Sequence, residues 1–241
     1  MKILSSYKQK IRKNVNSIMT NLGITSLSIF DTLLDKRIKK TDNFFFIQIG
    51  ANDGITHDDI YTFVTRNKVR GIVIEPLPDF FEKLVDNYKK HPQIKKINVA
   101  IHHENKKLEL YRVNSKISEL PKWSQGIASF EKEHHLKCGI PSKYIICEEV
   151  DCMSFDELIV QNNISYIDLL QIDTEGYDYQ IIKMINFNQI KPCIIRFEHL
   201  VQHGFMSKNV LRECLTHLYD NGYFISMEKN DAIAYLPEKI F

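Results

Sequence analysis

Short hydrophobic runs alternate with amphipathic stretches along this chain from residue 44 onward. Runs of this length predict buried β-strands, and the stretches between them repeat apolar residues at helical spacing. Strands that alternate with helices favour a parallel sheet covered by helices on both faces. The expected strands are 44–50, 71–76, 95–101, 166–173 and 191–199, and the expected helices are 58–67, 79–91, 155–163, 177–185 and 209–222.

Three further strand-like segments do not fit a purely parallel sheet. Residues 108–113 and 143–150 are expected to pair as an antiparallel addition, and residues 223–237 close the chain as a hairpin. The whole pattern predicts an α/β fold with a doubly wound, mostly parallel seven-stranded sheet and a C-terminal antiparallel hairpin. A dinucleotide-binding dehydrogenase half would continue in βαβ units, so the hairpin argues against an NAD-dependent enzyme.

Residues 114–142 lack a sustained period and carry several Pro and Gly residues. A segment this long inside a compact domain is usually a lid, a substrate loop or disordered. We expect it to form a lid or substrate loop over the carboxyl ends of the strands, where its aromatic side chains would suit a sugar ring. The alternative is a crossover that packs Trp123 and Phe130 into the core.

Composition indicates one globular domain with a short appendage. The chain has 241 residues, of which 44% are hydrophobic and 26% charged, as in ordinary soluble proteins. No apolar run approaches the roughly 20 residues of a membrane span, and no secretory signal is recognisable. Five cysteines without a C-x-x-C pair indicate incidental thiols in a reducing compartment, so we expect a cytoplasmic protein.

The charge is unevenly distributed along the chain. Residues 1–40 carry nine Lys or Arg and two Asp, a net +7, whereas the whole chain has +2, which leaves −5 for the remainder. We therefore divide the chain into a basic N-terminal helical extension (1–43) and a main domain (44–241). The extension either docks on an anionic membrane surface or a protein partner, or caps its own domain. The acidic main domain argues against nucleic acid as a partner.

Candidate binding residues stand where the expected parallel strands end. Ligands of doubly wound sheets bind outside these carboxyl ends, and small residues let the backbone approach them. The first strand ends in a turn of small and polar residues, the second in an acid that suits a ribose diol, and the third in small residues that suit an adenine. These residues are Gly50, Ala51, Asn52, Asp53 and Gly54, then Glu75 and Pro76, then Asn98 and Ala100. The alternative role of Glu75 is a favourable charge at the start of helix 79–91.

Carboxylates gather at the ends of the fourth and fifth strands. Asp173 and Glu175 follow the fourth, and Glu198 and His199 end the fifth. Neighbouring carboxylates raise one another's pKa or collect a cation, and either effect assists removal of a proton from a hydroxyl. Our candidate bases are Asp173, then Glu175, then His199. Asp173 and Glu198 are the weak candidates for a divalent metal, and the alternative for Asp173 and Glu175 is cofactor positioning and helix capping. The doublets His102-His103 and His134-His135 are not expected to bind metal, because adjacent side chains on regular elements point apart.

The runs FIQIGANDG, GIVIEPLPDFFEKL, INVAI, IDLLQIDTEGYDYQIIKMI and CIIRFEH resemble the FkbM-type methyltransferases over about residues 44–200. The resemblance implies a class I methyltransferase fold, S-adenosylmethionine as methyl donor, and O-methylation of a hydroxyl on a sugar, glycan or natural product. It also implies that Gly50, Asn52 and Gly54 hold the methionine part of the donor and that Glu75 holds its ribose. Asp173 and Glu175 would then form the family's D-x-E-G motif.

Two positions depart from the family pattern. The family usually has an acidic residue at Gln48 and a lysine at Gln171. We expect the paired Gln–Gln exchange to preserve a local contact that a Lys–carboxylate pair otherwise makes. Gln48 still belongs to the expected cofactor-binding set. The exchange motivates an alternative function, namely a structural or regulatory subunit that binds adenosylmethionine or a related nucleoside without turnover.

Overall fold

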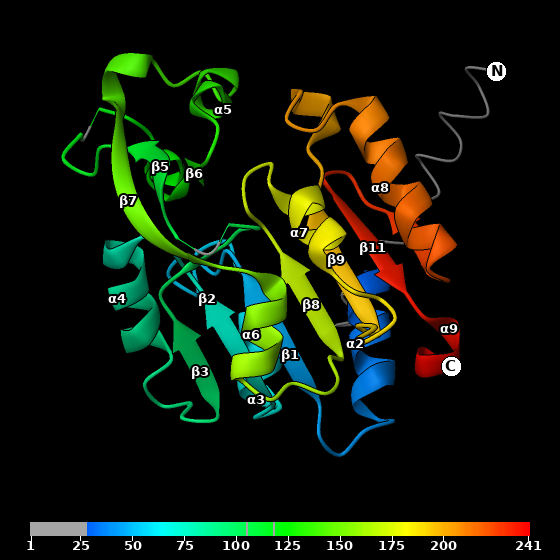
Figure 1. Cartoon of the computed structure of the whole chain (residues 1–241). Coiled ribbons are helices and arrows are strands. Elements are labelled where there is room, and N and C mark those ends of the chain that lie inside the picture. The colour runs from blue at the N-terminus through cyan, green and yellow to red at the C-terminus, as the bar shows by residue number, and fades with distance from the viewer. Residues whose placement is uncertain (1–27, 105, 118) are drawn as a thin grey trace, which may run out of the picture.

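The computed structural model describes residues 28–241 apart from residues 105 and 118 (Figure 1). Most of the expected basic N-terminal extension lies outside the described residues. The helix expected there is predicted by apolar residues at helical spacing between Ile3 and Leu22. The side chain of Trp123 also lies outside the described part of the chain.

Seven strands form the central sheet, in the order β10-β11-β9-β8-β1-β2-β3. Six of them point in the same direction, and β11 is antiparallel to both of its neighbours, β9 and β10. The predicted fold class, with its C-terminal hairpin, is therefore confirmed. The strand bounds are β1 (Phe45–Ile49), β2 (Arg70–Ile74), β3 (Ile94–Ile97), β8 (Leu169–Ile172), β9 (Ile194–Glu198), β10 (Phe224–Met227) and β11 (Asp231–Tyr235).

Alternate side chains of each strand belong to two different cores. Ile47 and Ile49 of β1 pack with α6 (Phe155–Gln161), α7 (Asp178–Met184) and α8 (Lys208–Asp220), whereas Phe46 packs on the opposite face of the sheet. That face is covered by α2 (Ile29–Ile38), α3 (Tyr61–Arg66) and α4 (Pro78–Asn87), as Figure 1 shows. Burial on both faces explains why these strands read as continuous apolar runs.

The helix α2 is part of the second core, because Phe30, Leu33 and Leu34 are buried in it. Its start is fixed by a capping box, in which the Ser28 hydroxyl accepts from the Asp31 amide at 3.0 Å. Its end is held by an ion pair from Arg37 to the fully buried Asp168.

Two of the predicted boundaries are wrong. The helix expected at 58–67 begins only at Tyr61, because the Asp58 carboxylate accepts from the amides of Ile60 and Tyr61 at its start. The strand expected at 95–101 divides into β3 and β4 (Ala100–Ile101), which belong to different sheets. Asn98 marks the break, since its side-chain amide donates to the carbonyls of Glu75 and Pro76 at 2.7 and 3.0 Å.

A smaller sheet stands over the carboxyl ends of the central strands, in the order β4-β7-β5-β6. The predicted antiparallel pairing is confirmed, with β5 (Lys107–Val113) along β7 (Ile145–Met153). Residues 114–142, called here the cap segment, contain η1 (Lys122–Gly126), β6 (Ala128–Ser129) and α5 (Lys132–Lys137). The segment that lacks a period in sequence therefore consists of short elements attached to β5.

No helix in the described part of the chain is long and apolar enough to cross a membrane. All five cysteines lie in this part, and each is a free thiol.

Candidate active site

A cavity of about 450 Å³ opens at the carboxyl ends of β1, β2 and β8. This is where ligands of doubly wound sheets bind, and the volume falls in the usual range of small-molecule sites. Its walls come from the turn after β1, the end of β2, β4, the cap segment and the turn after β8. Of the residues expected from the sequence, the lining includes Gln48, Gly50, Ala51, Asn52, Asp53, Glu75, Pro76, Ala100, Asp173 and Glu175.

The turn after β1 packs tightly against the turn after β8 and against α4. Gly50 has a φ of +81°, and a Cβ there would overlap the backbone carbonyl oxygen of Asp173. Gly54 has a φ of +76°, and its missing Cβ would meet Leu84 and Tyr88 in the core, away from the cavity. Both positions need glycine because of the protein's own packing, and only Gly50 lines the cavity.

Glu75 ties this turn to the end of β2. One carboxylate oxygen accepts from the amide of Asn52 at 2.8 Å and the other from the amide of Leu77 at 2.9 Å. Burial raises the pKa of Glu75 to about 7, although the two amide bonds oppose this shift. Each oxygen keeps a second acceptor site toward the cavity. Asn98 does not line the cavity. Its side-chain amide donates to the backbone carbonyls of Glu75 and Pro76.

The turn after β8 brings Asp173 and Glu175 to the cavity. Asp173 is an exposed residue of the cavity wall. The protein that surrounds its carboxyl group raises its pKa above the usual value, and the charges of Glu175 and Asp178 raise it further. The pKa of Glu198 is also raised, by burial and then by Asp173. These carboxyl groups therefore hold protons more strongly than isolated acids do.

Asp178, the first residue of α7, links the turn after β8 to the end of β9. Its carboxylate accepts from the Thr174 hydroxyl at 2.9 Å and from the Glu198 amide at 3.1 Å. Burial raises the pKa of Asp178 to about 6. Neither Asp173 nor Glu175 makes a side-chain cap of α7.

His199 and Glu198 do not line the cavity. The His199 ring is buried, and its Nδ1 accepts from the amide of Val201 at 3.3 Å. The structure thus brings Asp173 and Glu175 to the same cavity as the glycine turn. Glu198 and His199 are not part of the cavity lining.

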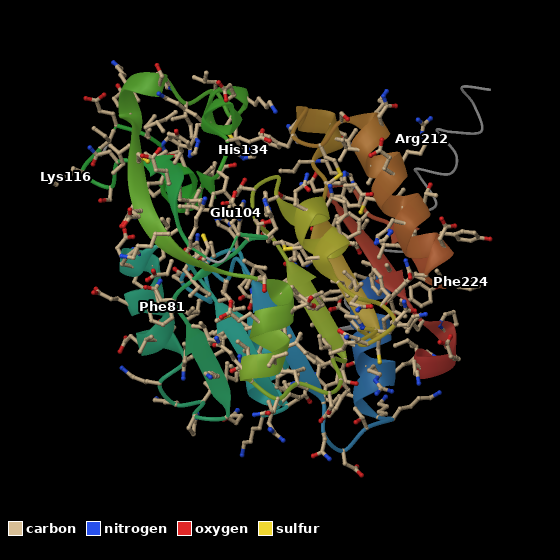
Figure 2. The ribbon with its side chains drawn as sticks, viewed as in Figure 1. Phe81, Glu104, Lys116, His134, Arg212 and Phe224 are labelled. Carbon is tan, nitrogen blue, oxygen red and sulfur yellow. The ribbon has the colours of Figure 1, made fainter. Side chains whose placement is uncertain are left out.

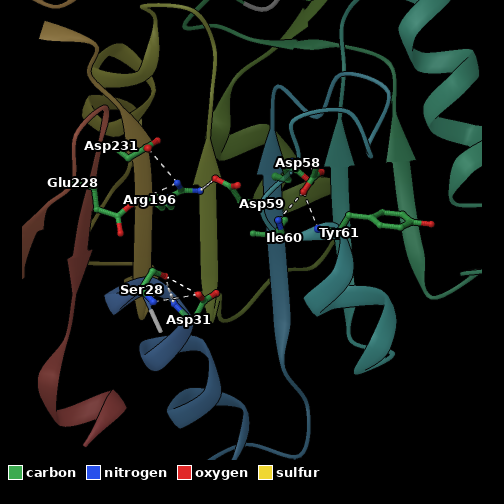
Figure 3. Close-up of polar contacts among 10 residues, drawn as sticks. Ser28, Asp31, Asp58, Asp59, Ile60, Tyr61, Arg196, Glu228 and Asp231 are labelled. Atoms are coloured by element: carbon green, nitrogen blue, oxygen red, sulfur yellow. Dashed lines mark hydrogen bonds and ion pairs between the residues drawn. The ribbon is translucent and has the colours of Figure 1, made fainter. Parts of the chain in front are cut away.

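A polar row crosses the sheet on the α2–α3 face, and sequence analysis singled out two of its members, Gln48 and Gln171, but not Arg196. Gln48, Gln171 and Arg196 are successive register partners on β1, β8 and β9. The Gln48 amide donates to Asp58 at 2.9 Å, and Arg196 binds Asp59 at 2.5 Å and Asp231 at 3.1 Å (Figure 3). Arg196 stands out in sequence as a charge inside the buried run CIIRFEH, but nothing local shows which acids it meets.

Two buried amide oxygens of this row have no hydrogen-bond partner, those of Gln48 and Gln171. Both side chains line the cavity and are at least nine-tenths buried. Asp58 accepts from the Gln48 nitrogen, which fixes that oxygen as the free atom. Buried acceptors without partners are unusual, so both oxygens are suited to a donor on a ligand.

The cap segment closes the other side of the cavity through Gln125, Gly126, Ala128, Ser129 and Phe130. The Phe130 ring lies 5.2 Å from the Tyr177 ring, and the His102 ring stacks on Tyr177 at 5.0 Å. Phe130 and Tyr177 line the cavity, so they form an aromatic wall on part of its surface.

Within the described residues, one group of side chains has metal-ligand atoms close together, namely His102, His103 and Glu104 within 4.8 Å. However, His102 Nδ1 accepts from the Glu104 amide at 3.0 Å, which leaves the ring proton on Nε2. A ring in that state has no lone pair to offer a metal. Asp173 and Glu198 have no third ligand at that range in the described chain.

The two rings of the second histidine doublet stand edge to face, with centroids 6.1 Å apart and an interplanar angle of 83°. His134 Nε2 meets the Glu175 carboxylate at 3.1 Å, whereas His135 Nε2 faces the carbonyl of Ile127.

The sheet order and the cavity at its carboxyl edge match the class I methyltransferase fold, whose enzymes use S-adenosylmethionine. The family model described as "Methyltransferase FkbM domain" matches residues 48–225. The chain therefore belongs to the FkbM methyltransferase family.

Solved structures of similar fold include precorrin-6y C5,15-methyltransferase from Geobacter metallireducens GS-15, at 13% identity and a TM-score of 0.45 over 85% of each chain. The methyltransferase FkbM of Methylobacillus flagellatus KT matches at 12% identity and a TM-score of 0.49, over 80% of this chain and 44% of that one. A methyltransferase from Geobacter sulfurreducens matches at 10% identity and a TM-score of 0.44, over 98% of this chain and 96% of that one. No curated protein matches this chain.

Proposed function

We propose that this protein transfers the methyl group of S-adenosylmethionine to a hydroxyl of a sugar, glycan or other small natural product. The observation that carries this proposal is that Asp173 and Glu175 line the same cavity as the glycine turn. A base and a donor-binding turn on one cavity allow a hydroxyl to be deprotonated where the methyl is delivered.

The donor would be held by the turn 50–54 and by the end of β2. Glu75 would accept from the ribose hydroxyls through its remaining acceptor sites, and Pro76 and Ala100 would flank the adenine. The free amide oxygens of Gln48 and Gln171 suit the ammonium group of the donor's methionine part. When bound, S-adenosylmethionine supplies a methyl group on a sulfonium, which is a good leaving group.

The acceptor would lie between the carboxylates and the aromatic wall. Asp173 is our first candidate for the base, because its raised pKa brings its proton affinity nearer to neutral pH, where a base works best. Glu175 is second, and His199 is third because it lies behind the cavity. The apolar faces of Phe130 and Tyr177 suit the C–H faces of a sugar ring, and the cap segment would exclude water.

The charge of the lining supports a small acceptor in preference to nucleic acid. Seven carboxylates line the cavity, those of Asp53, Asp58, Asp59, Glu75, Asp173, Glu175 and Asp231, against the cations Lys83 and Arg196. Phosphate groups would meet repulsion there, whereas a cationic donor and a neutral hydroxyl acceptor would not.

Methyl transfer from labelled S-adenosylmethionine to a panel of monosaccharides, oligosaccharides and hydroxylated natural products tests the proposal. We expect a product with one added methyl on oxygen, and loss of that product in Asp173→Asn. An RNA arm serves as the comparison, and methylation of RNA alone would refute the acceptor class. Donor binding by calorimetry without product over the whole panel would favour a binding subunit.

A further inference from the structure

One buried histidine connects the cap segment to the turn that carries the acceptor-side carboxylates. His134 lies on α5 and is 2% exposed, and its Nε2 is 3.1 Å from a carboxylate oxygen of Glu175. A carboxylate only accepts, so Nε2 is the donor in this bond. Figure 2 labels His134 between α5 and the segment that leads into α8. The second carboxylate oxygen of Glu175 remains for the cavity, which Glu175 lines.

The backbone of this turn depends on the same segment. Glu175 has a φ of +52° and Gly176 a φ of +99°, so two successive residues adopt the left-handed region. A non-glycine residue pays about 1 kcal/mol or more for that conformation, and surrounding contacts must hold it there. One such contact is the Ser129 hydroxyl of β6, which donates to the Glu175 carbonyl at 3.2 Å.

The position of His134 is itself fixed from the other side. Its ring stacks on Phe205 at 4.6 Å and an interplanar angle of 29°. A Cβ on Gly176 would lie 3.4 Å from His134 Nδ1, so the ring also packs close to the backbone of Gly176. In the orientation that the structure shows, the His134 ring stacks on Phe205 and donates to Glu175 at the same time.

We propose that His134 is a positioning residue that holds the Glu175 carboxylate toward the cavity, so that the acceptor side of the site is set by the cap segment. The inference rests on the proposed function, in which Glu175 faces the acceptor. His134 does not line the cavity and acts through Glu175. An acceptor that holds the cap segment in place would thereby also hold the Glu175 carboxylate in place.

Three variants separate the hydrogen bond from the packing. His134→Phe keeps the stack on Phe205 and removes the donor, whereas His134→Gln keeps a donor at the Nε2 position and removes the ring. His134→Asn has the same amide but falls short of Glu175, so it is the matched control for His134→Gln.

The first measurement needs no acceptor. Hydrogen exchange of residues 173–177 is followed in the full chain saturated with adenosylhomocysteine. We expect exchange about five- to tenfold faster in His134→Phe and His134→Asn, because one hydrogen bond that holds the turn is lost. We expect wild-type exchange in His134→Gln.

The second measurement is methyl transfer to whichever panel acceptor is turned over. We expect kcat to fall roughly 10- to 100-fold in His134→Phe and His134→Asn, with the donor dissociation constant within about twofold of wild type. His134→Gln should retain kcat. A purely structural role predicts the opposite ranking, with Phe the most tolerated.

The outcomes decide between the two roles. Wild-type exchange and kcat in His134→Phe would overturn the proposal, and so would equal losses in His134→Gln and His134→Asn. Should His134→Phe fail to fold, the amide pair decides alone. If no panel acceptor is methylated, the proposed function fails by itself, and the exchange measurement still tests the link from His134 to Glu175.

Discussion

Gly126 of the cap segment lies so close to Asn52 of the glycine turn that a Cβ on Gly126 would overlap the Asn52 side-chain amide. Asn52 has a φ of +50°, and its backbone amide donates to Glu75. The cap segment, the turn after β1 and the end of β2 therefore meet at one point of the cavity wall. We therefore expect a displacement at Gly126 to reach the residues proposed to hold the donor.

Gly126→Ala should weaken binding of S-adenosylmethionine by about tenfold, because an overpacked contact of this kind costs roughly 1–3 kcal/mol. The effect is read by calorimetry. Gly139→Ala is the control, since Gly139 has open space around its missing Cβ but a φ of +75°. That control should lose about 1 kcal/mol of folding free energy without weaker donor binding. Wild-type donor affinity in Gly126→Ala would show that the contact does not shape the donor site.

Glu75→Gln should flatten the pH dependence of folding stability between about pH 4.5 and 7. The pKa of Glu75 is raised from 4.5 to about 7 by burial, so between these values the folded state binds more protons than the unfolded state. The free energy of unfolding therefore falls as the pH rises through this range, and Glu75 contributes at most about 3 kcal/mol to the fall. Above the folded-state pKa, the contribution of Glu75 no longer changes with pH.

Denaturant unfolding of the wild type and Glu75→Gln at pH 5, 6, 7 and 8 measures this difference. The variant should also lose a pH-independent increment, because its amide cannot accept well from the backbone N–H groups of both Asn52 and Leu77. Parallel stability curves for the two proteins would contradict the assigned pKa of Glu75.

Gln48→Glu should destabilise the fold by about 1–3 kcal/mol, since the introduced carboxylate would be buried next to Asp58. Adding Gln171→Lys should recover at least about 1 kcal/mol, because Gln48 and Gln171 are register partners on adjacent strands. Gln171→Lys alone should be unfavourable beside Arg196, its other register partner. A urea-unfolding cycle over the four proteins gives the coupling, and additivity within about 0.5 kcal/mol would mean that the two positions do not interact.

Arg196→Met should destabilise the protein by about 3–5 kcal/mol, the usual result of removing one partner from a buried ion pair. Arg196 is 6% exposed, contacts Asp59 and Asp231, and lies over the Phe30 ring at 4.8 Å. Asp59→Asn is the control, because the Asp59 side chain is 63% exposed and should cost under about 1 kcal/mol. Thermal unfolding compares the two, and similar small losses would show that Arg196 is dispensable for the fold.

The sequence by itself determined the order and type of the main elements, because a strand buried on both faces leaves a short continuous apolar run and an amphipathic helix leaves a helical period. It also determined which residues follow the strands, so Gly50, Glu75, Asp173 and Glu175 could be assigned to one edge of the sheet. The exact ends of the strands could not be predicted from the sequence. Asn98 interrupts one predicted strand through a side-chain hydrogen bond, and the pattern of apolar residues does not reveal that bond.

Only the tertiary structure decided which of these residues meet. Gly54 and Asn98 turn away from the cavity, whereas Arg196 reaches Asp59 across 137 positions and His134 reaches Glu175 across 41. Such pairs depend on how whole elements pack against each other. A charged or polar side chain in a strand shows that a partner must exist, because an unpaired buried group is costly, but the identity of that partner is set by the packing of distant segments.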